Sequence, residues 1–160
     1  YNFELLSGYK FSVEAVTKLV KSFPDNIIGC KDSTSNLFEN LKLPNFLMFP
    51  GTEKKLLTGL ELGNSGIISA ICNVTAPLAR KVFDDFEKKK KQTQNDKLIA
   101  VREVFDKYNL ISALHSYMST KDNNFKNLLP PLDLLNSTKK KELIDKLDNL
   151  KFVIKDNLAA

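Results

Sequence analysis

The sequence has 160 residues, of which 42% are hydrophobic and 27% are charged, and its formal net charge is +5. This balance is typical of a globular chain and excludes an intrinsically disordered one. No apolar run approaches the roughly 20 residues of a membrane helix, and the first residues lack the order of a secretory signal. We therefore expect a cytoplasmic protein without a membrane partner. Because the first residue is Tyr1 and not methionine, the chain is also consistent with a fragment or a processed product.

The number and position of the cysteine, histidine and lysine residues limit the kinds of functional site that the chain can contain. The two cysteines, Cys30 and Cys72, lie in apolar runs, which fits free thiols in a reducing compartment and no disulfide framework. With one histidine, His115, and no Cys-x-x-Cys pair, we expect no structural zinc site. The run from Lys88 to Lys91 follows an apolar helix face, so it predicts an exposed helix end and no nucleic-acid partner.

Strand and helix patterns alternate through the first part of the chain. Residues 1–3 look like the tail of a strand, and Leu6-Ser7-Gly8 indicates a turn. Apolar runs predict further strands at residues 27–30, 46–49 and 67–72. The predicted helices are residues 13–23 after an N-cap at Ser12, a short one at 36–42, one capped by Thr52, and a long one from near Pro77. Apolar strands separated by helices indicate a parallel sheet covered on both faces.

Two architectures fit this alternation, a doubly wound sheet and a (β/α)₈ barrel. No Gly-x-Gly-x-x-Gly or phosphate-loop pattern follows a strand, so nucleotide binding has no support. From Gln92 on, apolar residues recur only at helical spacing, with a last helix capped by Asn136 or Ser137. We therefore expect two segments, residues 1–91 with strands and helices and residues 92–160 with helices alone.

Polar residues follow the predicted strands, where a barrel would form its active site. They are Tyr1, Lys31 with Ser33, Gly51 with Glu53, and Ser69 with Asn73. Water is scarce at the end of a buried strand, and a lysine amine that loses its proton there is a nucleophile toward carbonyl carbon. The alternative for Lys31 is a structural side chain whose charge reaches solvent at the rim.

Several motifs, in order and spacing, resemble the dihydrodipicolinate synthase and N-acetylneuraminate lyase family of Schiff-base aldolases and lyases. They are Tyr1-Asn2 with Ser7-Gly8, residues 29–33, residues 50–53, residues 66–69 with Asn73, and Pro130-Pro131. The chain looks like the C-terminal half of such an enzyme. The resemblance implies an α/β fold in which residues 1–91 form the C-terminal half of a (β/α)₈ TIM barrel, the region of strands 5–8. Residues 92–160 would form a C-terminal helical extension.

The same resemblance implies roles for individual residues. Lys31 would form an imine with the keto carbon of a small-molecule 2-oxo acid, and Tyr1 would relay protons to and from the substrate hydroxyl. The positions that match substrate contacts are Ser33, Gly51, Glu53, Ile68 through its carbonyl, and Ser69. No metal or organic cofactor is implied, and relatives of this kind are commonly homo-oligomers, usually tetramers.

Departures from the family pattern bear on the substrate. Leu6 stands where the synthases carry an arginine, which favours a lyase, whereas Thr52-Glu53-Lys54 differs from the residues of the neuraminate lyases. Arginine often precedes the late proline pair, and Leu129 stands there. The resemblance therefore favours a lyase or aldolase that cleaves or forms a carbon–carbon bond of a 2-keto-3-deoxy sugar acid or N-acetylneuraminate, releasing pyruvate.

Two alternatives stay open. One is a 4-hydroxy-tetrahydrodipicolinate synthase, which joins pyruvate to aspartate semialdehyde. The other, from a different class, is a non-catalytic α/β interaction module or inactive fragment in which Lys31 is only structural. Because the family's carboxylate-binding loop belongs to an earlier strand, we expect that the 160-residue chain alone is not a competent enzyme.

Overall fold

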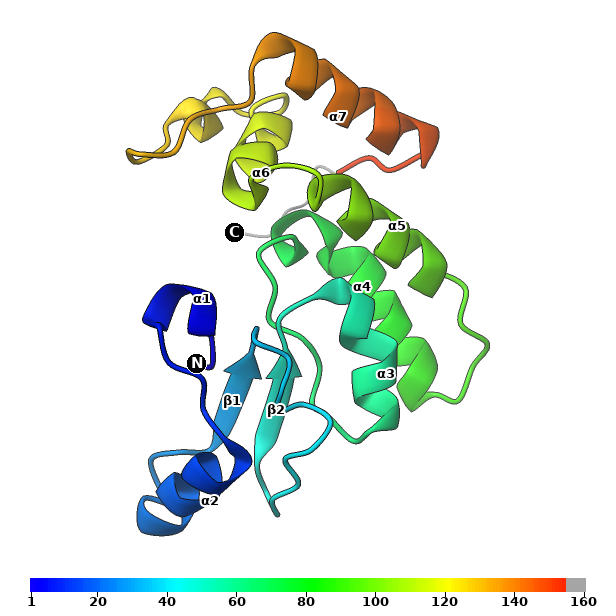
Figure 1. The fold of residues 1–160 in the computed structure, drawn as a ribbon. Helices are drawn as coiled ribbons and strands as arrows, with labels where there is room; N and C mark the ends of the chain where they lie inside the picture. Colours follow the sequence, from blue (N-terminus) through cyan, green and yellow to red (C-terminus); the bar gives the residue numbers. More distant parts are fainter. Residues whose placement is uncertain (155–160) are drawn as a thin grey trace. The chain divides into compact units, whose positions relative to one another are not determined.

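The computed structural model describes residues 1–154 and divides the chain into two compact units. The first unit comprises residues 1–69 and 81–92, and the second comprises residues 70–80 and the chain from Thr93 on. Helices and parallel strands are both present, so the predicted α/β class is confirmed (Figure 1).

The sheet of the first unit is parallel, as the sequence predicts. Strand β1, Gly29–Asp32, pairs with β2, Leu47–Pro50, so that Asp32 lies opposite Pro50 (Figure 1). Asn2 adds a single parallel bridge to Asp32. The prediction that the first of these strands is buried on both faces is wrong, because Ile28 is 61% exposed and β1 is only half-buried until Asp32. Within residues 1–154, β1 has β2 as one neighbour and on its other side only the bridge from Asn2 to Asp32, so the beginning of β1 is open to solvent.

Helices before the sheet begin and end at residues that the sequence marks. Helix α1, Glu4–Ser7, ends at Gly8, whose φ of +67° is a conformation that glycine adopts without strain. Helix α2, Val13–Ser22, begins where predicted, since the Ser12 side chain accepts a hydrogen bond from the backbone N–H of Ala15.

The connection from β1 to β2 contains no helix, so the helix predicted at residues 36–42 is wrong. The Asp32 carboxylate accepts the backbone N–H groups of Leu37 and Phe38 and thereby holds them in an irregular loop. The helical pattern does not go beyond the Leu37 carbonyl, which accepts the N–H of Asn40 at 3.0 Å and the N–H of Leu41 at 2.8 Å. The apolar side chains of this loop still form the core of the unit, whose buried members are Val16, Leu37, Phe38, Leu41 and Met48.

The helix predicted after Thr52 is confirmed. The Thr52 hydroxyl accepts from the backbone N–H of Lys54 at the start of the 3₁₀ helix η1, Glu53–Lys55, and helix α3, Leu56–Glu61, continues from it. This cap fixes the position of Glu53 directly beyond the C-terminal end of β2.

A strand at residues 67–72 is predicted, and the structure has none there. The Ser65 N–H donates to the Met48 carbonyl and the Ile68 N–H donates to the Pro50 carbonyl, so the segment runs beside β2. It has one residue too many between these bonds for a regular ladder, and Gly66 takes up the excess with a φ of +137°. Helix α4, Cys72–Glu87, also begins earlier than the predicted start near Pro77, because a short apolar run fits either a strand or a buried helix turn.

The second unit contains the predicted C-terminal helices. They are α5, Asn95–Phe105, α6, Leu110–Met118, and α7, Ser137–Asn149. The short 3₁₀ helix η2, Asn123–Lys126, lies between α6 and α7 and is not among the predicted helices. Asn136 caps α7 by accepting the backbone N–H of Lys139. The buried core of this unit includes Val101, Phe105, Leu114, Leu143 and Leu147.

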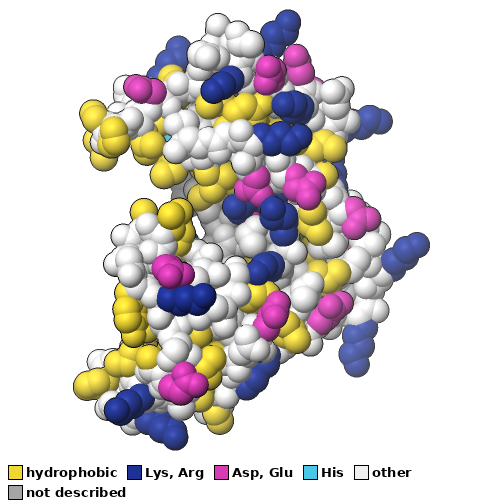
Figure 2. All heavy atoms as spheres, viewed as in Figure 1, with side chains coloured by type: hydrophobic (Ala, Val, Ile, Leu, Met, Phe, Trp, Pro, Cys, Tyr) yellow, Lys and Arg dark blue, Asp and Glu magenta, His cyan; other side chains and the backbone are white. Residues whose placement is uncertain are grey.

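The surface carries mixed charge. Lys88 to Lys91 are exposed beyond the end of α4, as predicted. On the face that Figure 2 shows, lysine and arginine side chains are interspersed with acidic ones and do not gather in a single basic patch. None of the helices within residues 1–154 has the length and apolar character needed to cross a membrane.

Candidate active site at the strand ends

Tyr1 and Lys31 lie together in the structure. The Asn2 N–H donates to the Lys31 carbonyl at 2.9 Å, and the Ser33 N–H donates to the Asn2 carbonyl at 2.9 Å, so the first residues run alongside the end of β1. The Lys31 amine, Nζ, lies 4.4 Å from the centroid of the Tyr1 ring. A cation at this distance is attracted by the ring face, which holds the amine and the phenol side by side. The Tyr1 side chain is also accessible, since the residue is 62% exposed.

Ser33 and Gly51 lie beside Tyr1 and Lys31 at the same end of the two strands. The Ser33 hydroxyl donates a hydrogen bond to the Tyr1 phenol oxygen at 3.2 Å. The Gly51 N–H donates to the Asp32 carbonyl at 3.0 Å, which brings the end of β2 against the end of β1. A Cβ atom on Gly51 would lie 2.3 Å from the Ser33 hydroxyl oxygen, so only glycine fits beside Ser33.

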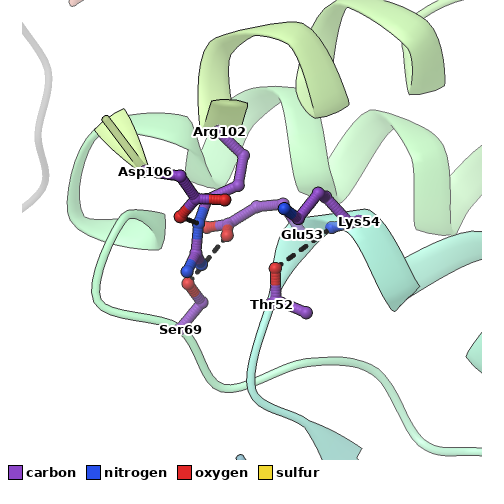
Figure 3. Close-up of polar contacts among 6 residues, drawn as sticks. All are labelled: Thr52, Glu53, Lys54, Ser69, Arg102 and Asp106. Atoms are coloured by element: carbon purple, nitrogen blue, oxygen red, sulfur yellow. Dashed lines mark hydrogen bonds and ion pairs between the residues drawn. The ribbon is translucent and has the colours of Figure 1, made fainter. Parts of the chain in front are cut away.

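The remaining predicted residues form a second group beyond the end of β2. The Ser69 hydroxyl donates to Oε2 of Glu53 at 2.8 Å, and Thr52 caps the turn that carries Glu53 (Figure 3). Glu53 is fully buried, so its carboxylate is bonded within the protein. Ile68 is 45% exposed and is bonded through its N–H to the Pro50 carbonyl. The structure thus places all the predicted residues at the C-terminal ends of the strands or directly beyond them.

Three polar residues beside the predicted site residues are absent from the sequence-based prediction of the site. Asn2, Asp32 and Asn36 form a hydrogen-bonded cluster, with Asn2 and Asp32 fully buried. Two of them follow Tyr1 and Lys31 directly, and neighbouring residues of a strand point to opposite faces. A polar residue that alternates with a candidate catalytic one is a signal that could have identified Asn2 and Asp32.

Cys30 and Cys72 are half-buried cysteines, and neither takes part in a disulfide. Burial raises the pKa of the Cys30 thiol, so the thiol stays protonated at neutral pH and is a weak nucleophile. Cys30 also packs against the core of the first unit, which supports a structural role for it. Within residues 1–154 there is no group of three or more His, Cys, Asp or Glu side chains arranged to hold a metal ion.

Comparison with known families and sequences gives a consistent result. The family model described as the dihydrodipicolinate synthetase family matches residues 1–150. The 4-hydroxy-tetrahydrodipicolinate synthase of Hydrogenobaculum sp. is 38% identical over 98 residues, which are 55% of this chain and 33% of that enzyme. The N-acetylneuraminate lyase of Actinobacillus pleuropneumoniae serotype 5b is 34% identical over 88 residues, or 52% of this chain and 30% of that enzyme.

Solved structures with a similar fold belong to the same group. The chain matches dihydrodipicolinate synthase from Cyanidioschyzon merolae, solved with lysine bound, with a TM-score of 0.81 and 17% identity. It matches a prophage protein of the dihydrodipicolinic acid synthase family from E. coli, solved with pyruvate, with a TM-score of 0.84 and 22% identity. Each match covers 96% of this chain and 54% or 55% of the other. The chain therefore spans about half the length of these barrel proteins.

Proposed function

The chain belongs to the dihydrodipicolinate synthetase family, and on that premise we propose that it forms a Schiff base with a 2-oxo acid through Lys31. The observation that carries the proposal is the position of the Lys31 amine, 4.4 Å from the ring of Tyr1, with Ser33 bonded to the phenol oxygen. An amine nucleophile beside a proton carrier is the pair that imine chemistry needs.

The proposed reaction uses each group in turn. The neutral Lys31 amine adds to the C2 carbonyl of the 2-oxo acid, and the hydroxyl of the adduct leaves as water with a proton from solvent, which gives a protonated imine. The exposed Tyr1 phenol passes its proton to solvent, and the phenolate accepts the proton of the C4 hydroxyl. The C3–C4 bond then breaks, its electron pair forms the C2–C3 double bond, and the imine π pair moves to nitrogen. An aldehyde leaves, and protonation of the enamine at C3 followed by hydrolysis releases pyruvate and restores the Lys31 amine. The synthase direction runs through the same enamine.

We propose a lyase for 2-keto-3-deoxy sugar acids or N-acetylneuraminate, with the synthase reaction on aspartate semialdehyde as the alternative. Leu6 supports the lyase, because an apolar side chain offers no charge to a second substrate carboxylate. The proposed substrate contacts are Ser33, Gly51, Glu53, Ile68 and Ser69, and all of them lie at the ends of β1 and β2 or just beyond. The same proposal includes the organisation of the chain and its assembly. Residues 1–91 would form part of a barrel, residues 92–160 would form a helical extension, and the assembly would be homo-oligomeric.

Borohydride trapping tests the imine. The chain is incubated with pyruvate and borohydride, and peptide mapping locates the reduced adduct. We expect the adduct on Lys31, its loss in Lys31→Arg, and its retention in the control Lys21→Arg, an exposed lysine in α2. Trapping probes Lys31 directly and does not require turnover of a complete substrate. An adduct distributed over many lysines, or none at all, would contradict the proposal and favour a non-catalytic module.

A further inference from the structure

A buried polar network lies directly behind the Tyr1–Lys31 pair. The Asn2 side-chain amide donates to Oδ1 of Asp32 at 2.8 Å and to Oδ1 of Asn36 at 2.7 Å, and its oxygen accepts the Phe11 N–H at 3.2 Å. Asn36 in turn donates to the Phe11 carbonyl at 2.8 Å. Asn2 therefore has its side chain bonded to three separate segments, and all of them lie in the first unit.

The Asp32 carboxylate is the centre of this network. Besides Asn2, it accepts the backbone N–H groups of Ser35 at 2.9 Å, Leu37 at 2.8 Å and Phe38 at 3.0 Å. These bonds fold the loop that begins at Ser33, whose hydroxyl bonds to the Tyr1 phenol. Asp32 is thus connected to Tyr1 by two routes, through Asn2 on the backbone side and through the loop that begins at Ser33 on the phenol side.

We propose that the Asn2–Asp32–Asn36 network positions Tyr1 against Lys31, so that Asn2 is a positioning residue for the proton carrier. This inference rests on the proposed function. Lys31 can serve as the nucleophile while Asp32 serves the network, because the two residues are neighbours in β1 and their side chains point to opposite faces. The Lys31 amine is held by β1 itself, whereas the exposed Tyr1 depends on the Asn2 anchor for its place. Loss of the anchor should therefore impair proton transfer more than imine formation.

Exchange of the pyruvate methyl protons in D₂O reports this proton transfer without a second substrate. In the Lys31 imine of pyruvate, a C3–H bond breaks and its proton moves to the oxygen of Tyr1 in its phenolate form. The electron pair forms the C2–C3 double bond of the enamine, and the imine π pair moves to nitrogen. Return of a deuteron from solvent to C3 and hydrolysis of the imine then give labelled pyruvate. NMR follows the loss of the methyl signal.

A double-mutant cycle distinguishes positioning from a general structural role. Tyr1→Phe and Asn2→Ala are made singly and together, and both exchange and borohydride trapping are measured with pyruvate. We expect Tyr1→Phe to slow exchange roughly a hundredfold, as loss of a general acid–base group does, and Asn2→Ala roughly tenfold through misplacement. In the Tyr1→Phe background, Asn2→Ala should change exchange little, because its effect acts through the missing phenol. Trapping on Lys31 should persist in all four proteins.

Controls keep the inference falsifiable. Asn64→Ala removes another buried amide of the first unit, which donates to the Phe38 carbonyl, and should leave exchange at the wild-type rate. If Asn2→Ala does not fold, Asn36→Ala replaces it in the cycle, since Asn36 is only partly buried. If Asn2→Ala, or Asn36→Ala in its place, slows exchange by the same factor in the wild-type and in the Tyr1→Phe background, the inference is overturned while the imine proposal stays intact. Failure of the wild-type chain to trap pyruvate on Lys31 would instead overturn the proposed function and the inference with it.

Discussion

Gly51 lies so close to Ser33 that a side chain on it would clash, and this allows a prediction at the scale of single residues. In Gly51→Ala the new Cβ would meet the Ser33 hydroxyl at 2.3 Å and the Ser33 Cα at 3.0 Å. The φ of Gly51 does not lie in the left-handed region, so replacement by alanine would stabilise the folded chain slightly if no atom stood in the way of the new Cβ. We expect instead a loss of about 1–3 kcal/mol in unfolding free energy from overpacking, together with weaker pyruvate trapping. Thermal unfolding and borohydride trapping measure both effects.

A matched substitution, Gly8→Ala, tests whether the effect of Gly51→Ala comes from the steric clash or simply from replacing a glycine. No heavy atom lies within 4 Å of a Cβ built on Gly8, where alanine would meet only the strain of a φ of +67°. Gly8→Ala should therefore cost about 1 kcal/mol and leave trapping unchanged. In addition, Ser33→Gly should recover part of the stability lost in Gly51→Ala. A stabilised Gly51→Ala variant would refute the steric argument.

At the same scale, the motifs of the sequence name Lys31 as a candidate nucleophile and Tyr1 as a candidate proton carrier, and the structure brings the two side chains together. The same motifs name Ser33, which bonds to the Tyr1 phenol oxygen, but not the polar network beside this pair. Alternation with Lys31 could have marked Asp32 as a buried polar residue, but it could not have predicted the four hydrogen-bond donors of Asp32, which come from Asn2 and from the loop at residues 35–38. Asn2 reaches Asp32 across a parallel bridge that no local pattern encodes.

At the scale of elements, helix starts were predictable and the irregular strand was not. Ser12, Thr52 and Asn136 each accept a backbone N–H at the start of the expected helix, since capping is a local interaction. The prediction of a strand at residues 67–72 is wrong because these apolar residues belong to two structures, an irregular stretch beside β2 and the start of α4. The failed helix at 36–42 has a similar cause, since the Asp32 side chain captures its N–H groups.

The cap of α7 provides the prediction at this scale. Asn136 accepts the Lys139 N–H at 2.9 Å, and α7 buries Leu143 and Leu147 in the core of the second unit. Asn136→Ala should lower the unfolding free energy by about 1 kcal/mol, whereas Asn136→Ser should retain most of it, because serine caps equally well. Chemical denaturation measures the difference. Equal stability of the two variants would show that the side-chain cap contributes nothing.

At the scale of the whole molecule, the chain leaves apolar surface open beside its sheet. Ile28 is 61% exposed and Leu47 is 44% exposed, and the two are neighbours because the Leu47 N–H donates to the Ile28 carbonyl at 2.9 Å. They lie at the start of the strands, at the opposite end from the site. Within residues 1–154, the ladder on the other side of β1 is reduced to the bridge at Asn2. Open strand edges and adjacent apolar residues favour association with another chain.

We therefore expect the chain to self-associate through this end of the sheet. Burial of one isoleucine side chain contributes about 1.5–3 kcal/mol, so Ile28→Lys should weaken association by roughly tenfold or more in Kd. Sedimentation velocity over a range of concentrations measures the shift from larger species to monomer. Leu129→Lys is the control, because Leu129 is 84% exposed and belongs to the second unit, whose described residues form no strand. Equal effects of the two substitutions would mean that added charge alone disperses the chains, whereas a selective effect of Ile28→Lys would identify the sheet end as the associating surface.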